Sequence, residues 1–234
     1  MRSVMVKTVD QQADGIILKY REMLVGQRTQ AINALRGHAV EFGVVAAKGT
    51  VKVAALLTEL AADSAIPISA RAMFNQMGTH IEALDQQVAA LGDQLMTLHK
   101  ANPVSRLLTE VPGVGPLGAI TMALTVEPGN FASGRHFAAW LRLTPKEHST
   151  GGKQRMGKIS KAGNERLRQL LFVGAMSVIR FAQPGSKSAS GWLLQLLERK
   201  PRKLAAVALA KQDGPGHLGH DGDGEAYRRQ PATV

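Results

Sequence analysis

The sequence predicts an all-α fold, on three observations. Apolar residues recur at alternating three- and four-residue steps over two long segments, residues 8–42 and 69–100, as in helices that pack through a narrow seam. Runs with the two-residue alternation of a half-buried strand are scarce. The chain of 234 residues is 44% hydrophobic, which is enough apolar material for a packed core. We therefore expect a long coiled-coil-like helical hairpin followed by a helical domain.

The segment 8–42 is predicted to form one long helix, which the internal Gly15 and Gly26 weaken. Gly43 ends this helix, and a shorter one at 51–62 follows and is closed by Pro67. The predicted seam of the long helix comprises Ala13, Ile17, Tyr20, Leu24, Gln27, Ala31, Ala34 and His38.

The clearest periodicity lies in residues 69–100, where Ser69 is the expected N-cap and Asn102-Pro103 the stop. The seam comprises Phe74, Met77, Ile81, Leu84, Val88, Leu91, Leu95 and Leu98. Two helices with such seams form an antiparallel hairpin, either within one chain or between two copies. We expect a homo-oligomer that pairs through residues 8–42 and 69–100, and we assign no chemistry to this region.

The pattern changes after Pro103, which suggests three regions: a helical region at 1–102, a second domain at 103–211 and a tail at 212–234. The tail has no periodicity, and we expect it to be disordered. Its Asp and His residues lack the spacing of a metal site. Helices in the second domain are expected at 104–110, 116–126, 137–143 and 164–181, and in the segment that ends in LAAVALA.

The positive charge of the chain is concentrated in one block. Residues 135–211 hold 16 Lys or Arg and 3 Asp or Glu, a net charge of +13, whereas the whole chain has a net charge of +11. Charges that serve only solubility would be spread over both halves. A block of this kind is typical of a surface that binds nucleic-acid phosphates, so we expect DNA as a partner.

The composition also excludes several classes of function. The chain has no Cys, which excludes a disulfide framework, a thiolate nucleophile and a Cys-based zinc site. No segment approaches the roughly 18 uninterrupted apolar residues of a membrane span, and no cleavable leader is recognisable. We therefore expect a cytoplasmic protein with no membrane partner.

The segment VPGVGPLGAI, residues 111–120, is a glycine-rich turn between two predicted helices. Gly113 and Gly115 permit positive φ and close backbone approach, and Pro116 suits the first turn of the next helix. Backbone N–H groups at such a turn can hold a phosphate without reading base sequence. The turn resembles the hairpin of helix-hairpin-helix DNA-binding modules. The alternative is a tight helix–helix connection with no ligand.

The segment HSTGGKQRMGKISKAG, residues 148–163, combines hydroxyls, glycines and cations, and it is too rich in glycine for a helix interior. It lacks the spacing of a P-loop. Ser149 is the candidate residue: it could clamp a phosphate, attack a phosphodiester, or lie in a surface loop without function. These three alternatives stay open on the residues alone. The cations expected to contact nucleic acid are Lys153, Arg155, Lys158 and Lys161.

The combination of VPGVGPLGAI, FASGRHFAAWLRLTP, HSTGGKQRMGKISKAGNERLRQLL and RKPRKLAAVALA resembles the C-terminal domain of the insertion sequence 110/116/902 transposase family. The segment LVGQRTQAINALRGHAVEFGV, which starts at Leu24, resembles the central helical region of the same family. The resemblance implies a DNA recombinase that is guided by an element-encoded bridge RNA. It also implies that Ser149, within the family motif at 148–153, is the nucleophile.

The family pairs this serine with an RNase-H-like domain whose four carboxylates hold Mg²⁺. In the family these four carboxylates lie upstream of the segment that residues 1–8 match. Asp10 and Asp14 lie downstream of the RNase-H-like domain and do not belong to the four. We therefore expect no metal site or cofactor in this chain, which would be a fragment that is inactive alone, with Mg²⁺ bound only by the intact protein. The alternative is a non-catalytic nucleic-acid-binding protein that co-assembles with intact transposase or inhibits it.

Two further expectations follow from the resemblance. A one-base shift in reading turns the tail into a sequence close to the family's helical ending, so we expect a compensated double frameshift near Lys211 and Asp223. A DNA recombinase would associate with the bacterial nucleoid.

The charge block predicts DNA binding that depends strongly on salt. Because each neutralised phosphate releases counterions, the logarithm of affinity should fall linearly and steeply with the logarithm of salt concentration. The measurement is a titration of labelled duplex DNA with the chain at several salt concentrations. An affinity that stays constant from low to high salt would contradict the prediction.

Overall fold

The computed structural model describes residues 6–127, 130–131, 134–144, 148–153, 155, 157, 163–183 and 190–213. Within these ranges the regular elements are helices, and β-pairing is limited to one isolated bridge, so the all-α prediction is confirmed. The described residues form two compact units that divide between Leu95 and Met96, with Val6 and Lys7 belonging to the second unit. The tail predicted to be disordered lies outside the described residues from 214 onwards.

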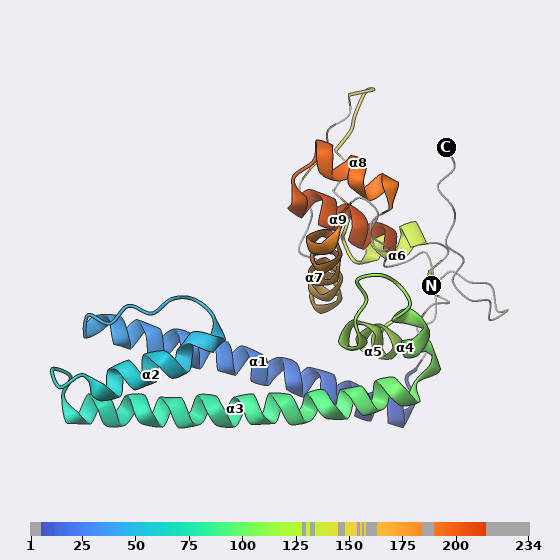
Figure 1. Ribbon diagram of the computed structural model, residues 1–234. Coiled ribbons are helices and arrows are strands. Elements are labelled where there is room, and N and C mark those ends of the chain that lie inside the picture. Colours follow the sequence, from blue (N-terminus) through green and yellow to red (C-terminus); the bar gives the residue numbers. More distant parts are fainter. Residues whose placement is uncertain are drawn as a thin grey trace. The chain divides into compact units, whose positions relative to one another are not determined.

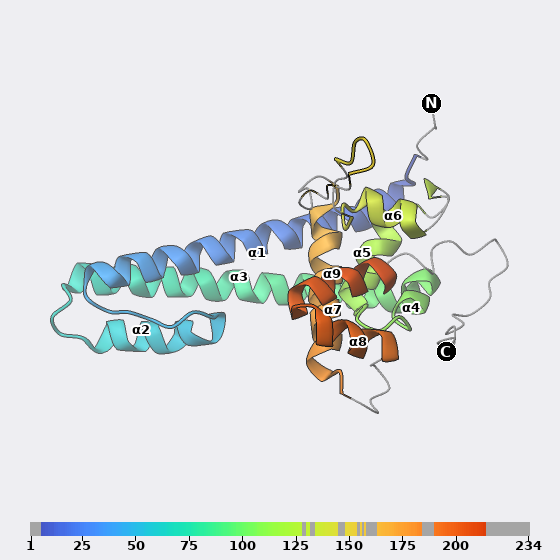
Figure 2. The same ribbon diagram turned by 90° about the horizontal axis from the view of Figure 1, so that it is seen from above.

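The first unit contains α1 (Val9–Glu41), a 3₁₀ turn η1 (Thr50–Lys52), α2 (Val53–Ala62) and most of α3 (Ile68–Ala101). The helices α1 and α3 lie side by side and antiparallel within one chain (Figures 1 and 2). A capping box starts α1: the Gln11 amide donates to Thr8 Oγ1 at 3.2 Å, and the Thr8 amide donates to Gln11 Oε1 at 3.0 Å. These two bonds satisfy N–H groups that the first turn leaves without a partner.

The seam of α3 faces the core of this unit. All eight of its positions are buried or half-buried, and Leu84 and Val88 pack with Leu24 of α1. The position of Ser69 differs from the prediction, because α3 begins at Ile68 and Ser69 lies in its first turn.

The predicted seam of α1 is buried at Leu24, half-buried at Ile17 and Ala31, and wrong at its other five positions, which are exposed: Ala13, Tyr20, Gln27, Ala34 and His38. In the second half of the helix the buried positions are instead Ile32, Leu35 and Ala39. The reason is that an α-helix repeats every 3.6 residues, so a strict seven-residue pattern drifts around it. In the second half of α1 the larger apolar side chains also pack against α2, since Ile32 and Leu35 share one cluster with residues of α2.

The second unit contains six helices in its described part. Their caps are local: Asn102 Oδ1 accepts from the Ser105 amide, and Asn164 Oδ1 accepts from the Leu167 amide. The sequence analysis did not predict α8, a short helix capped by Ser190. The helices are α4 (Pro103–Leu108), α5 (Pro116–Thr125), α6 (Gly134–Trp140), α7 (Glu165–Phe181), α8 (Gly191–Arg199) and α9 (Arg202–Asp213).

One apolar core holds the second unit together. Phe137 of α6, Leu167 of α7 and Ala205 of α9 are each fully buried in it, and α4, α5 and α8 contribute further side chains. The helix α9 continues to Asp213, so it includes the first two residues of the tail that was predicted to be disordered. Among the described residues, no helix combines the length and the hydropathy that crossing a membrane requires.

Replacing Leu84 with Ala should lower the free energy of unfolding by about 2–4 kcal/mol. The side chain is only 4% exposed, so its removal leaves a cavity between α1 and α3. Chemical denaturation followed by circular dichroism measures the loss. Gln87→Ala on the exposed face of the same helix is the control and should change the free energy by less than about 0.5 kcal/mol. Equal effects for the two variants would show that the seam does not carry the packing.

Candidate functional site

The glycine-rich turn between α4 and α5 is pressed against the backbone of α7. Gly113 has φ +85°, and a Cβ atom built on it would lie 3.0 Å from the carbonyl carbon and oxygen of Gly174. A Cβ atom built on Gly174 would lie within van der Waals overlap of the Gly113 carbonyl oxygen, at 1.8 Å. Both positions therefore require glycine, Gly113 for its φ angle as well as for space. The observed role of Gly113 is packing.

Gly115 does not use the positive φ that glycine permits, since its φ of −78° and ψ of 169° are extended. The cause is Pro116, whose ring disfavours helical backbone at the residue before it. Pro116 itself occupies the first turn of α5, as predicted. Gly115 is the N-cap of α5, and a Cβ atom on it would meet no atom within 4 Å, so this side of the turn is open.

The backbone amides at the start of α5 are available to an anion. The Gly115 carbonyl accepts from the Ala119 amide at 2.9 Å, which is the first bond of the helix. No described residue accepts a hydrogen bond from the amides of Leu117 and Gly118, as expected for the first turn. These N–H groups lie at the positive end of the helix dipole, where a phosphate is favoured.

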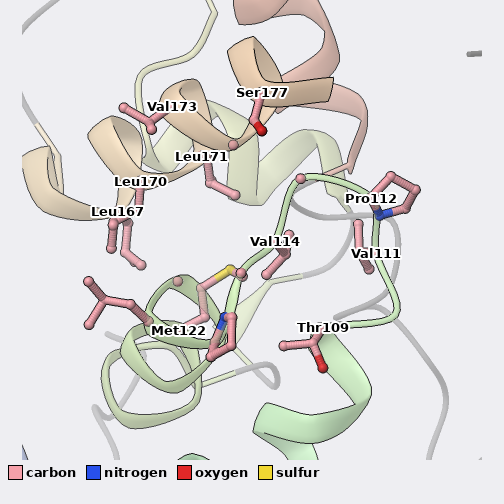
Figure 3. Close-up of a pocket in the computed structure, with 16 residues that line it drawn as sticks. Thr109, Val111, Pro112, Val114, Met122, Leu167, Leu170, Leu171, Val173 and Ser177 are labelled. Atoms are coloured by element: carbon pink, nitrogen blue, oxygen red, sulfur yellow. The ribbon is translucent and has the colours of Figure 1, made fainter. Parts of the chain in front are cut away.

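A pocket of about 500 Å³ lies between this turn, α5 and α7 (Figure 3). Most of its lining is apolar, and the hydroxyls of Thr109 and Ser177 are its polar side-chain groups. Val114 and Met122 line it on one side, and Leu171 lines it from α7 (Figure 3). An apolar lining of this kind does not suit a phosphate, although Leu117 and Gly118, which carry the open amides, also line the pocket.

The predicted serine segment forms a tight hairpin at its start. An antiparallel bridge pairs Thr150 with Lys153, and the Lys153 amide donates to the Thr150 carbonyl at 3.2 Å. The two residues between them, Gly151 and Gly152, have φ of +58° and +77°. Positive φ at both central residues is the requirement of a type I′ turn, and two glycines meet it without strain. The sequence STGGK therefore dictates a hairpin at this point.

The hydroxyl of Ser149 is held by a backbone donor from the opposite arm of this hairpin. The Arg155 amide donates to Ser149 Oγ at 3.1 Å, and one residue further out the His148 amide donates to the Arg155 carbonyl at 2.8 Å. Because Oγ accepts this bond, its own hydrogen is left for transfer or donation. A donor aimed at Oγ also stabilises negative charge that develops on that oxygen.

The hairpin brings together three of the predicted site residues: the half-buried Ser149 and the exposed Lys153 and Arg155. Neither cation forms an ion pair with a described residue, so both charges are open to a partner. Lys158 and Lys161 lie outside the described residues. Gly113 and Gly115 belong to the α4–α5 turn, a different element of the same unit.

A second serine lies close to an imidazole, a pair that the sequence analysis did not predict. Ser105 Oγ lies 2.8 Å from His99 Nδ1, at the junction of α3 and α4. Ser105 is fully buried, so its hydroxyl cannot reach a phosphodiester and its role is to join the two helices. No signal in the sequence identified this pair, because it arises from the angle at which α4 leaves α3.

The described residues do not fit a metal site. No group of three or more His, Cys, Asp or Glu side chains converges among them. Asp10 and Asp14, which the resemblance places outside the family's metal site, lie in the first turns of α1. The described part of the chain therefore has no ligand set for the divalent cation that the resemblance implies.

The serine hairpin and the α4–α5 turn belong to a transposase domain. Residues 105–190 match the family described as Transposase IS116/IS110/IS902 family, and this range includes both features. Residues 105–190 of the chain are therefore a domain of the IS116/IS110/IS902 transposase family.

Three curated relatives support this assignment. The chain is 49% identical to "Putative transposase y4pF/y4sB" of Sinorhizobium fredii over 91% of its own length and 55% of the relative. It is 37% identical to "Probable family 20 transposase" of Pseudomonas aeruginosa over 91% of the chain and 64% of the relative. It is 34% identical to "Transposase for insertion sequence element IS1111A" of Coxiella burnetii over 92% and 60%. The chain thus spans between about half and two thirds of the length of these relatives.

Replacing Gly174 with Ala should destabilise the second unit by about 2 kcal/mol or more, because the added methyl overlaps the Gly113 carbonyl. Gly118→Ala is the matched control. It also adds a methyl to a helix, but the nearest atom would be 3.9 Å away, so helix propensity should raise stability by about 0.5–1 kcal/mol. Thermal unfolding of both variants tests the opposite signs. A stabilised Gly174→Ala protein would show that the two backbones are not in contact.

Proposed function

We propose that this chain acts in DNA transposition by an insertion sequence, with Ser149 as the nucleophile on a DNA phosphodiester. The observation that carries the proposal is the hairpin, which holds the hydroxyl on a backbone N–H donor between two exposed cations. The family match over residues 105–190 and the names of the relatives support the reaction class.

In the proposed step, Ser149 Oγ forms a bond to phosphorus and loses its proton to solvent or a base. The bond from phosphorus to one ester oxygen of the DNA backbone breaks, and that oxygen leaves as a hydroxyl after it takes up a proton. The product is a covalent serine–DNA phosphodiester. The Arg155 amide would stabilise charge on Oγ as its proton leaves, and the Lys153 ammonium would stabilise charge on the non-bridging phosphate oxygens.

DNA binding is proposed to use two elements of the second unit. The first is the start of α5, whose open amides at Leu117 and Gly118 would receive a backbone phosphate as in a helix-hairpin-helix module. The second is the basic block, which places four exposed cations at the junction of α8 and α9: Arg199, Lys200, Arg202 and Lys203. Contacts of this kind position the protein without reading base sequence, so we propose that an element-encoded guide RNA supplies the sequence specificity.

Self-association is proposed to use α1. Its first half exposes apolar side chains at Val9, Ile16, Tyr20 and Met23, which lie three, four and seven residues apart and so share one helix face. An apolar stripe of this kind is suited to a second copy of the chain. Recombination joins two DNA partners, and a homo-oligomer would supply a nucleophile for each.

A second candidate function rests on the lack of a carboxylate cluster among the described residues. In this alternative the chain binds nucleic acid without cutting it, and it co-assembles with a complete transposase or competes with it for DNA. The two candidates share the DNA-binding surface and differ in whether Ser149 forms a bond to DNA.

Ser149→Ala should abolish covalent capture of DNA and leave DNA affinity within about 1 kcal/mol, because only one neutral hydrogen bond is lost. The assay uses a chimera in which residues 6–213 replace the aligned segment of the Sinorhizobium fredii relative, with Mg²⁺, guide RNA and a labelled target. Thr150→Ala removes the neighbouring exposed hydroxyl of the same hairpin and should retain the adduct.

An adduct that resists denaturation in the Ser149→Ala chimera would show that another residue is the nucleophile. The chain alone should bind DNA and form no adduct. An adduct from the chain alone would rule out the non-catalytic alternative and the proposed need for a metal site elsewhere.

A further inference from the structure

The end of α6 has an unusual residue at its turning point. The Arg142 amide donates to the Ala139 carbonyl at 3.0 Å, and the Leu143 amide donates to the Ala138 carbonyl at 3.0 Å. This pair of bonds is a Schellman motif, whose turning residue adopts left-handed backbone and is usually glycine. Here it is Arg142, with φ +57°, the one residue other than glycine with positive φ in the described part of the chain. A side chain at this position is held against the preference of the backbone.

An exposed indole lies two residues before Arg142. Trp140 is 38% exposed, although large aromatic side chains are usually well buried. Its ring stacks on Phe137, with centroids 5.8 Å apart and planes at 29°, and Phe131 contacts it edge-on at 5.4 Å. Phe137 is fully buried, so the indole lies on a fixed base.

The backbone at Trp140 is packed against the end of the serine segment, residues 148–163. A Cβ atom at Gly163 would lie 2.5 Å from the Trp140 carbonyl oxygen and 3.4 Å from Arg142 Cγ. Gly163 is the last residue of the segment 148–163, and it directly precedes Asn164, the N-cap of α7. The Arg168 guanidinium donates to the Leu141 carbonyl at 3.1 Å and ties α7 to the same point. The backbone of Trp140 and the side chain of Arg142 therefore lie beside Gly163, at the end of the segment that carries Ser149.

We propose that Trp140 and Arg142 form a docking site for one unpaired nucleobase, which stacks on the indole while the guanidinium contacts the base or its phosphate. The inference rests on the proposed nucleic-acid-binding function and deepens it, since neither residue contributes to the α4–α5 turn or the serine hairpin. An exposed aromatic side chain that packs on the core and lies in a positively charged block is an arrangement that binds single-stranded nucleic acid. Strand exchange and guide pairing both expose unpaired bases.

The chemistry of the two residues favours a base over other ligands. A phosphate alone would need charge and hydrogen-bond donors, not an indole. An apolar protein segment would gain nothing from a guanidinium held in a strained backbone conformation. Stacking is tolerant of base identity because each base has a π-face, and an arginine adds a cation–π contribution. The shared chemistry is therefore an unpaired base, of DNA or of RNA.

The chain has two tryptophans, and Trp192 on α8 is also 38% exposed, which provides a matched control. In Trp192→Phe, fluorescence reports Trp140 alone, and in Trp140→Phe it reports Trp192 alone. Each protein is titrated with oligothymidylate, with oligouridylate and with an abasic oligonucleotide of the same length, which carries phosphates without bases. We expect the base-bearing strands to quench Trp140 strongly, the abasic strand to quench it little, and Trp192 to respond weakly to all three.

Two variants extend the test to affinity. Trp140→Leu should weaken single-strand binding at least about fivefold while duplex binding changes little. Arg142→Gly should raise or preserve the melting temperature, because glycine suits the left-handed position, and should still weaken single-strand binding. A role confined to folding would give the opposite result for Arg142→Gly, a lower melting temperature with unchanged binding.

The outcomes separate this inference from the proposed function. The base-docking site would be overturned if base-bearing and abasic strands quenched Trp140 equally, or if both tryptophans were quenched equally. Salt-dependent duplex binding would still support the DNA-binding proposal in that case. If no single strand and no duplex binds at low salt, both proposals fail. Stronger quenching by the deoxy strand or by the ribo strand identifies whether the docked base comes from DNA or from RNA.

Discussion

The second unit depends on one close contact between two backbones, Gly113 in the α4–α5 turn and Gly174 in α7. A side chain at either position would force the turn away from α7, because the hypothetical Cβ atoms lie 3.0 Å or less from backbone atoms across the contact. The contact lets Val111 and Val114 reach the core that α7 and α9 share. It also sets the position of Gly115 and so the direction in which α5 presents its free amides. The open amides at the start of α5 are thus a consequence of packing two glycines against each other.

The sequence was sufficient for features that depend on neighbouring residues and insufficient for those that depend on distant ones. The α3 seam and the start of α5 at Pro116 were predicted because periodicity and proline stereochemistry act locally. The sequence permits positive φ at both Gly113 and Gly115, and the structure uses it only at Gly113, because Pro116 favours extended backbone at the residue before it. The buried positions in the second half of α1 depend on where α2 packs, which no pattern within α1 records.

The candidate site divides in the same way. The residues of 148–153 alone left three roles open for Ser149, a phosphate clamp, a nucleophile and an inert loop position, and the resemblance to a family favoured the nucleophile. The structure adds three features that neither the residue pattern nor the resemblance predicted: the Arg155 amide on Ser149 Oγ, the buried Ser105–His99 pair and the left-handed Arg142. Each of these arises from a turn that brings together residues two to six positions apart, with geometry that depends on dihedral angles rather than on residue type. Such contacts carry no periodicity by which to predict them.

The hairpin separates two contributions that a single side chain often supplies together. The hydrogen bond to Ser149 Oγ comes from the Arg155 backbone, while the charge comes from the Arg155 and Lys153 side chains. The donor therefore persists whatever residue occupies position 155, proline excepted, and its position is set by the turn at Gly151 and Gly152. Charge at the site can change with the nucleic acid that is bound, while the polarisation of the hydroxyl stays constant. In the proposed reaction Ser149 would meet different DNA strands, and a backbone donor on a glycine-defined turn would polarise its hydroxyl equally for each of them.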